Sequence, residues 1–196
     1  MLDMLYLAGL SYLMGSIPFA FLLLKWTTGK DIRTLGTGNV GAMNSYDVTG
    51  SKLIGITVGV LDALKGAAAV IVAQTYFSEG LSGTALLGPK MWATFFAVLG
   101  HCYNVWLGFK GGRGLATAAG ASLLFMPSLV IAWLVVWVAA WFYSHKLHFC
   151  NISATACVIL IVPLFEPVEA IVFIVALAGL ILLRHRDVMK EAFKGG

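Results

Sequence analysis

Residues 53–77 read LIGITVGVLDALKGAAAVIVAQTYF and contain only two charged side chains, Asp62 and Lys65. About 20 apolar residues in helical conformation are enough to cross the hydrocarbon core of a bilayer. The stretch therefore predicts a transmembrane helix. Residues three apart share one face of a helix, so Asp62 and Lys65 are expected to meet there, either as a buried ion pair or with Lys65 as part of an anion site.

The same pattern recurs along the chain, which is 60% hydrophobic and only 11% charged. Pro127 interrupts the longest run near its middle, so that run is divided into two short spans. The sequence predicts an all-α integral membrane protein, a single domain over residues 1–196 with about seven transmembrane helices. The other apolar runs are 4–24, 91–107, 114–143, 152–164 and 168–183.

The basic residues predict the orientation of the chain, since Lys and Arg are enriched in cytoplasmic loops. With seven spans and the N-terminus outside, nearly all of them fall inside, and the C-terminus is then cytoplasmic. A six-span reading, with 114–143 as one tilted helix, separates the last two basic clusters and fits less well. The inside clusters are Lys25, Lys30, Arg33 and Lys52; Lys110 and Arg113; Lys146; and Arg184, Arg186, Lys190 and Lys194.

The stretch TLGTGNVGAMN at 34–44 contains a literal G-x-G-x-x-G. A dinucleotide fold is not predicted, because no strand precedes the stretch, and no Lys-Ser or Lys-Thr follows for a Walker A loop. Closely spaced glycines still let backbone N–H groups turn toward one phosphate, and Thr37, Asn39 and Asn44 add polar donors. The alternative is that the glycines only form turns or allow close helix packing.

A second glycine cluster, LGFKGGRG at 107–114, sets Lys110 and Arg113 among glycines, which suits an anion. The alternative is that both are interfacial anchors. His101 precedes this loop and is either a packing residue or a group for proton transfer or for a hydrogen bond to an anion. His185 opens the basic tail and is either an interfacial anchor or a substrate contact. The net charge of +4 suits an anionic leaflet or substrate, and nothing predicts a nucleic-acid platform, a metal site or a cofactor.

Five segments together resemble a bacterial membrane family that transfers a fatty acyl group from acyl phosphate to glycerol 3-phosphate. The likeness spans nearly the whole chain and implies a seven-span fold in the bacterial cell membrane, with an active site facing the cytoplasm. The segments are GSIPFAFLL at 15–23, GTGNVGAMN at 36–44, DALKG at 62–66, GHCYNVWLGFKGGRGLATAAG at 100–120 and RHRD at 184–187.

The resemblance assigns roles residue by residue. It implies catalytic roles for His101 and for Thr37, which stands where the family usually has serine. It implies substrate or phosphate binding by Gly38, Asn39, Gly41, Asn44, Lys65, Lys110, Gly111, Gly112, Arg113 and His185.

The chain also departs from the family pattern. Arg113 replaces a lysine and Asn104 a proline, while Asp47 replaces an arginine associated with the phosphate of the acceptor, and Val188 replaces an asparagine. Lys30, Arg33, Lys52 or Arg186 could compensate for the reversed charge at position 47.

The expected function is formation of lysophosphatidic acid from acyl phosphate and glycerol 3-phosphate, without metal or cofactor. Two alternatives remain open at this point. The first is an acyltransferase with another acceptor, which an acidic residue at position 47 would favour. The second is a non-catalytic anion-binding membrane protein, since transporters also place glycine-broken helices around a substrate.

Overall fold

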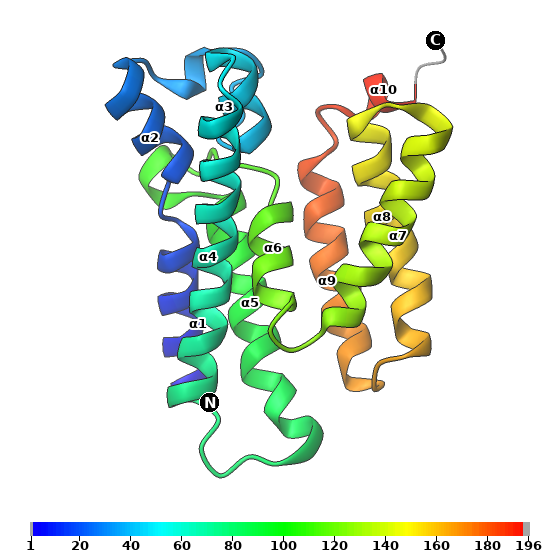
Figure 1. The fold of residues 1–196 in the computed structure, drawn as a ribbon. Coiled ribbons are helices and arrows are strands. Elements are labelled where there is room, and N and C mark those ends of the chain that lie inside the picture. Colours follow the sequence, from blue (N-terminus) through cyan, green and yellow to red (C-terminus); the bar gives the residue numbers. More distant parts are fainter. Residues whose placement is uncertain (1, 194–196) are drawn as a thin grey trace.

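The computed structural model describes residues 2–193, which form helices joined by turns and contain no strand (Figure 1). Lys194, part of the predicted basic tail, lies outside these residues. The helices are α1 (Leu2–Gly15), α2 (Phe19–Thr28), α3 (Ala42–Thr49), α4 (Lys52–Tyr76), α5 (Leu87–Cys102), α6 (Leu115–Ser122), α7 (Pro127–Ser144), α8 (Leu147–Ile161), α9 (Glu169–Arg184) and α10 (Met189–Ala192). Short 3₁₀ segments cover Ile32–Thr34, Gly83–Leu86, Val105–Leu107 and Val162–Leu164.

The first apolar run breaks between α1 and α2, where Pro18 cannot donate a backbone hydrogen bond. The break frees two carbonyl groups inside the bundle. Asn104 Nδ2 donates to the carbonyl of Ser16 at 2.6 Å, and Lys65 Nζ donates to the carbonyl of Ile17 at 2.9 Å. The interrupted helix is therefore held by α4 and by the turn after α5.

Glycines bring α4 close to α6. A Cβ at Gly66 would overlap the carbonyl of Thr117, and one at Gly120 would overlap the carbonyl of Ala63. Gly100 of α5 packs in the same way against the carbonyl of Tyr12 in α1. Small residues allow such close backbone contact between membrane helices, and here the contact fixes the register of α1, α4, α5 and α6.

Pro127 is the first residue of α7, so the predicted division of the 114–143 run is confirmed. The preceding helix, α6, has only 8 residues and is about 12 Å long, too short to cross a bilayer alone. Within residues 2–193, four ranges are long and apolar enough to span: Leu2–Thr28, Lys52–Tyr76, Pro127–Ser144 and Leu147–Leu164. The all-α prediction holds, while the count of seven spans and the orientation stay predictions.

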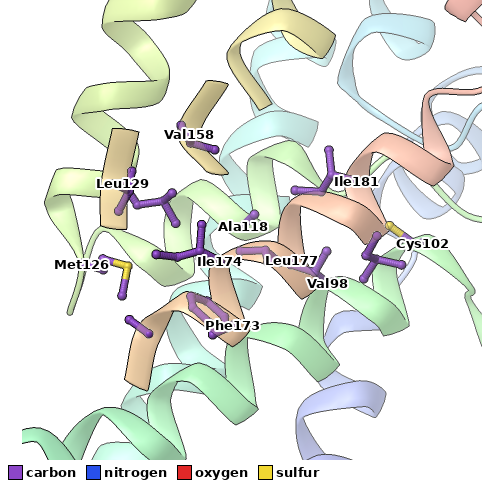
Figure 2. Packing of buried hydrophobic residues seen from close by; sticks show 13 residues of the cluster. Val98, Cys102, Ala118, Met126, Leu129, Val158, Phe173, Ile174, Leu177 and Ile181 are labelled. Carbon is purple, nitrogen blue, oxygen red and sulfur yellow. The ribbon is translucent and has the colours of Figure 1, made fainter. Parts of the chain in front are cut away.

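A buried apolar cluster joins the two sides of the bundle through α9. Figure 2 shows Ile174, Leu177 and Ile181 of α9 beside residues of the neighbouring helices. These neighbours are Val98 and Cys102 of α5, Ala118 of α6, Leu129 of α7 and Val158 of α8. Because α9 is fixed on several sides, the residues at its C-terminal end are held in place as well.

The helices α2, α3 and α10 lie at one end of the bundle, and the N-terminus lies near the other (Figure 1). The polar segments 25–52 and 184–190 therefore share one end.

Candidate active site

A cavity of about 620 Å³ opens at the end of the bundle that carries α3 and α10. Its wall combines the loop before α3, one face of α4, the end of α5, the start of α6 and the start of α8. The polar residues that line it are Asn39, Tyr46, Lys52, Asp62, His101, Arg113, His148, Asn151 and His185. The three polar clusters that the sequence sets far apart thus contribute to one cavity.

The first glycine loop, residues 36–41, is held by three hydrogen bonds of the Asn44 side chain and by one from the N–H of Asn39 to Thr37 Oγ1 at 3.4 Å. Asn44 accepts a hydrogen bond from the N–H of Thr37 at 3.0 Å and donates to the carbonyls of Leu35 and Asn39 at 3.1 and 2.9 Å. Gly36 and Gly38 have φ of 55° and 70°, which favours glycine, and a Cβ at Gly36 would overlap Asn44. Asn44 is 3% exposed, so it fixes the shape of the loop from inside.

These contacts change which groups are available to a phosphate. The N–H groups of Thr37 and Gly38 are used within the loop, the second by the carbonyl of Leu35. The first N–H groups of a helix have no intrahelical partner. Gly41, Ala42 and Met43 line the cavity, so the amino end of α3, with its partial positive charge, faces the space where an anion would bind.

His101 belongs to a buried array with Asp62 and Lys65. Asp62 Oδ1 lies 2.8 Å from Lys65 Nζ and 3.4 Å from His101 Nδ1, and the three residues are 2–6% exposed. The carboxylate favours the tautomer with a proton on Nδ1, which leaves a lone pair on Nε2. His101 and Asp62 line the cavity, so the array presents one oriented imidazole to it.

The second glycine loop, residues 111–114, is held from the far end of the chain. Arg184 donates from Nε to the carbonyl of Gly112 and from Nη2 to the carbonyl of Gly111, both at 3.1 Å. Gly112 lies directly against His101, because a Cβ there would overlap Nε2 of the imidazole. Arg184 therefore positions the backbone that packs on His101.

A second link joins this loop to the residues after α9. Arg113 Nη2 lies 2.8 Å from Asp187 Oδ2, and the Asp187 side chain is 54% exposed. Burial raises the pKa of the Asp187 carboxyl, but the hydrogen bond and charge of Arg113 outweigh burial and hold that pKa below its ordinary value. The Arg113 guanidinium is thus partly neutralised by this carboxylate at neutral pH.

His185 lines the cavity, and one of its ring nitrogens is buried without a hydrogen-bond partner among the described residues. Its Nδ1 lies 2.8 Å from the carbonyl of Ile181, which only an N–H can satisfy, so Nε2 carries a lone pair. Within the part of the chain that is described, this buried Nε2 has no hydrogen-bond partner. A ligand hydroxyl could donate to it.

An apolar pocket of about 270 Å³ lies beside the polar cavity, between α6, α7, α8 and α9. Leu115 and Ala116 line both spaces. Deeper in the pocket lie Leu129, Trp133, Ile174 and Leu177. A polar cavity and an apolar pocket therefore meet at the start of α6.

The sequence profile described as glycerol-3-phosphate acyltransferase matches residues 5–195, nearly the whole chain. The chain belongs to this family. The predicted family membership is thereby confirmed. Among curated glycerol-3-phosphate acyltransferases, one from Myxococcus xanthus is 42% identical over 75% of this chain and 73% of its own length. One from a Jannaschia species is 38% identical over 95% of this chain and 87% of its own.

Two solved structures of this family share the fold. Both are crystal structures of PlsY (YgiH), described as an integral membrane glycerol 3-phosphate acyltransferase. The glycerol 3-phosphate form matches with a TM-score of 0.81 at 33% identity, over 96% of this chain and 91% of that one. The lysophosphatidic acid form matches with a TM-score of 0.79 at 32% identity and the same coverage.

Against this family background, the structure separates the predicted site residues into two groups. Asn39, Gly41, His101, Arg113 and His185 line the cavity. The others do not line it, and their roles stay predictions: Thr37, Gly38, Asn44, Lys65, Lys110, Gly111 and Gly112.

The residues outside the lining have identifiable contacts. Asn44 shapes the first loop, Lys65 binds Asp62 and the carbonyl of Ile17, and Gly112 lets the second loop approach His101. Thr37 and Lys110 are exposed.

Of the departures from the family pattern, Arg113 lines the cavity, whereas Asp47, Asn104 and Val188 do not. Asp47 is exposed on α3, whereas its neighbours Met43 and Tyr46 line the cavity. Val188 is buried at 6% exposure, and Asn104 serves the helix break by donating to the carbonyl of Ser16. The acidic residue at position 47 therefore does not line the cavity.

Sequence reasoning did not single out Arg184 or Asn151 as site residues. Arg184 was counted only among the basic residues of the tail, and its role depends on a contact 72 positions away along the chain. Asn151 lies within an apolar run, where it lines the cavity and accepts a hydrogen bond from the indole of Trp137 at 2.8 Å. A polar amide inside an apolar helix was the only available signal.

Proposed function

We propose that this protein transfers a fatty acyl group from acyl phosphate to glycerol 3-phosphate, which yields lysophosphatidic acid and inorganic phosphate. The observation that carries the proposal is the junction of the polar cavity with the apolar pocket at Leu115 and Ala116. An acyl phosphate has one anionic end and one apolar chain, so it needs such a junction. Membership of the family supports the same reaction.

The acyl chain lies in the apolar pocket between α6, α7, α8 and α9. The pocket is walled almost entirely by aliphatic and aromatic side chains, among them Leu129, Trp133 and Ile174. Lipid tails are as apolar as these side chains, so the pocket contributes packing contacts that fix the acyl chain and orient its reacting end.

The donor phosphate binds at the amino end of α3, beside Gly41, with Arg113 as a neighbouring cation. Free helix N–H groups and a guanidinium both complement phosphate oxygens. The rigid first loop, fixed by Asn44, holds the amino end of α3 in place.

In the reaction, a hydroxyl oxygen of the acceptor attacks the acyl carbonyl and forms a new C–O bond. The bond between the carbonyl carbon and the phosphate oxygen breaks, and phosphate leaves with the electron pair. His101 Nε2 accepts a hydrogen bond from the attacking hydroxyl and orients it, and the departing phosphate takes the proton. Asp62 keeps the imidazole in the required tautomer through Nδ1.

The active site faces the cytoplasm in this proposal, with the N-terminus outside. Its support is that the end of the bundle with the cavity also carries the basic segments 25–52 and 184–190 (Figure 1). Reporter fusions at the C-terminus and in the loop before α5 would test the orientation, the first expected in the cytoplasm and the second outside.

The role of His101 is tested by His101→Ala in detergent-purified protein. The change should lower the rate of lysophosphatidic acid formation at least tenfold, since a positioned imidazole typically contributes about 10²-fold or more. His145→Ala is the matched control, because His145 lies in the turn after α7 and does not line the cavity. Equal turnover by wild type and a folded His101→Ala protein would remove His101 from the mechanism.

A further inference from the structure

One face of α4 runs down the wall of the cavity. Lys52, Gly55, Ile56, Gly59 and Asp62 all line it, at spacings of one helical turn or less. The rise of 1.5 Å per residue places Lys52 about 15 Å above Asp62 along the helix axis. Lys52 is exposed and Asp62 is buried, so this face leads from the mouth of the cavity to the His101 array.

Glycines in the middle of this wall let α3 pack closely against α4. Gly55 packs against Tyr46, where a Cβ would come within 2.9 Å of the Tyr46 Cβ, and Gly59 lies opposite Ala42. No bulky side chain of α4 other than Ile56 therefore stands between Lys52 and Asp62 on the wall. A small polar molecule could lie along it.

The charged side chains that line the cavity differ in whether they form ion pairs. Asp62 is shared between Lys65 and His101, and Arg113 is paired with Asp187. Lys52, in contrast, has no ion pair among residues 2–193. Among the described residues, no carboxylate therefore neutralises the charge of Lys52 on the cavity wall.

The position of Lys52 in α4 is also consistent with a bound anion. It is the first residue of α4, after the N-cap Ser51, whose Oγ accepts from the N–H of Ile54 at 3.4 Å. A cation at the amino end of a helix is unfavourable with respect to the helix dipole. Helix stability does not explain a lysine here, and an anion at the cavity mouth would neutralise its charge.

The other cations considered for compensation at position 47 do not line the cavity. Arg33 is paired with Asp31 at 2.6 Å, and Lys30 and Arg186 are exposed outside the lining. Asp47 itself lies off the wall. Among these candidates the geometry leaves Lys52.

We propose that Lys52 binds the phosphate of the acceptor at the mouth of the cavity and selects phosphorylated over neutral acceptors. The inference rests on the proposed function, because two phosphate-bearing substrates must then be held, and the amino end of α3 with Arg113 serves the donor. The glycerol part lies along Gly55 and Gly59, and its hydroxyl end reaches His101. The unpartnered Nε2 of His185 on the same cavity accepts from a second hydroxyl.

The test compares Lys52→Met and Lys52→Arg with Lys30→Met, a change of an exposed lysine outside the cavity lining. Lys52→Met should raise KM for glycerol 3-phosphate at least tenfold, with kcat within about threefold of wild type and KM for acyl phosphate unchanged, since a lost charge-assisted contact is worth about 1.5–3 kcal/mol. Lys52→Arg should restore most of the loss. With glycerol as acceptor, Lys52→Met and wild type should be equal.

Binding of labelled glycerol 3-phosphate to the purified proteins separates this inference from the proposed function. A dissociation constant at least tenfold weaker for Lys52→Met supports the inference. Equal binding by Lys52→Met and wild type, or no binding by wild type, overturns it whatever the turnover. A wild type that binds through Lys52 yet forms no lysophosphatidic acid overturns the proposed reaction alone.

Discussion

The two glycine-rich loops of the site are held in opposite ways. The loop at 36–41 takes its shape from Asn44, a residue of the helix that immediately follows it. The loop at 111–114 takes its position from Arg184 and Asp187, more than 70 residues further along the chain. The first loop is a local structure, and the second depends on the whole bundle.

This difference assigns different tasks to the loops. The first can hold the amino end of α3 as a fixed anion site without help from the C-terminal half of the chain. The second is tied to the end of α5 by the N–H groups of Gly111 and Gly112, which donate to the carbonyls of Cys102 and His101, and Arg184, the last residue of α9, holds the carbonyls of the same two glycines. Changes at the end of α9 should therefore affect turnover more than changes within the first loop.

The largest effect is expected for Arg184→Met. The change removes both hydrogen bonds to the carbonyls of Gly111 and Gly112 and frees the loop that packs on His101. A displacement of about 1 Å at a reacting group can cost on the order of 10²-fold in rate. Turnover measured as lysophosphatidic acid formation should fall by about that factor.

Arg186→Met is the matched control, because Arg186 is exposed two positions away and outside the cavity lining. Arg184→Lys should recover little of the lost turnover, since an ammonium cannot make the two hydrogen bonds of the planar guanidinium in the same geometry. Full activity in Arg184→Met would show that the second loop keeps its place without α9 and would abolish the contrast between the loops.

A smaller effect is expected for Asn44→Ala. It leaves the carbonyls of Leu35 and Asn39 without their amide donor, but Gly36 and Thr37 are exposed, so water can replace part of the loss. We expect about tenfold lower kcat/KM for acyl phosphate, by analogy with the 1–3 kcal/mol cost of unsatisfied groups. Asn44→Asp keeps the acceptor for Thr37 but sets a buried carboxylate against the carbonyls of Leu35 and Asn39, so its kcat/KM should be no higher than that of Ala. An Ala variant slower than Arg184→Met would reverse the proposed order.

The smallest effect is expected for Asp187→Asn, because this carboxylate is half-exposed and such pairs contribute little. The unfolding temperature in detergent should fall by no more than about 2 °C. The pKa of Asp187 is held below its ordinary value of 3.8, so its contribution is present above that value and is lost as the pH falls through the folded pKa. The difference between Asp187→Asn and wild type should be constant over about pH 5–8; a difference that vanishes within that range would contradict the Arg113 pairing.

Much of the fold follows from local patterns in the sequence. Apolar runs predict the helices, Pro127 predicts where one run divides, and the spacing of Asp62 and Lys65 predicts their pairing, which the structure shows at 2.8 Å. The break at Ser16–Pro18 was not predicted, although Pro18 marks it in the sequence as Pro127 marks the other division; the contacts of Lys65 and Asn104 with the carbonyls at the break are long-range.

The site was predictable in its parts and not in its assembly. The glycine motifs and the basic residues located both loops in the sequence. They could not show that the Asn44 amide donates to the carbonyl of Leu35 in its own loop, or that Arg184 donates to the carbonyl of Gly111. Such roles depend on long-range contacts. The reversed charge at position 47 likewise changes meaning once Asp47 is seen to lie off the cavity wall.

The central claim is that this protein transfers the acyl group of an acyl phosphate to glycerol 3-phosphate. The most direct measurement gives detergent-purified protein palmitoyl phosphate and labelled glycerol 3-phosphate, with acyl-carrier-protein and coenzyme A thioesters as alternative donors in parallel. The account predicts labelled lysophosphatidic acid from palmitoyl phosphate alone. Product from a thioester instead, or none from folded protein beside an active family member, would contradict it.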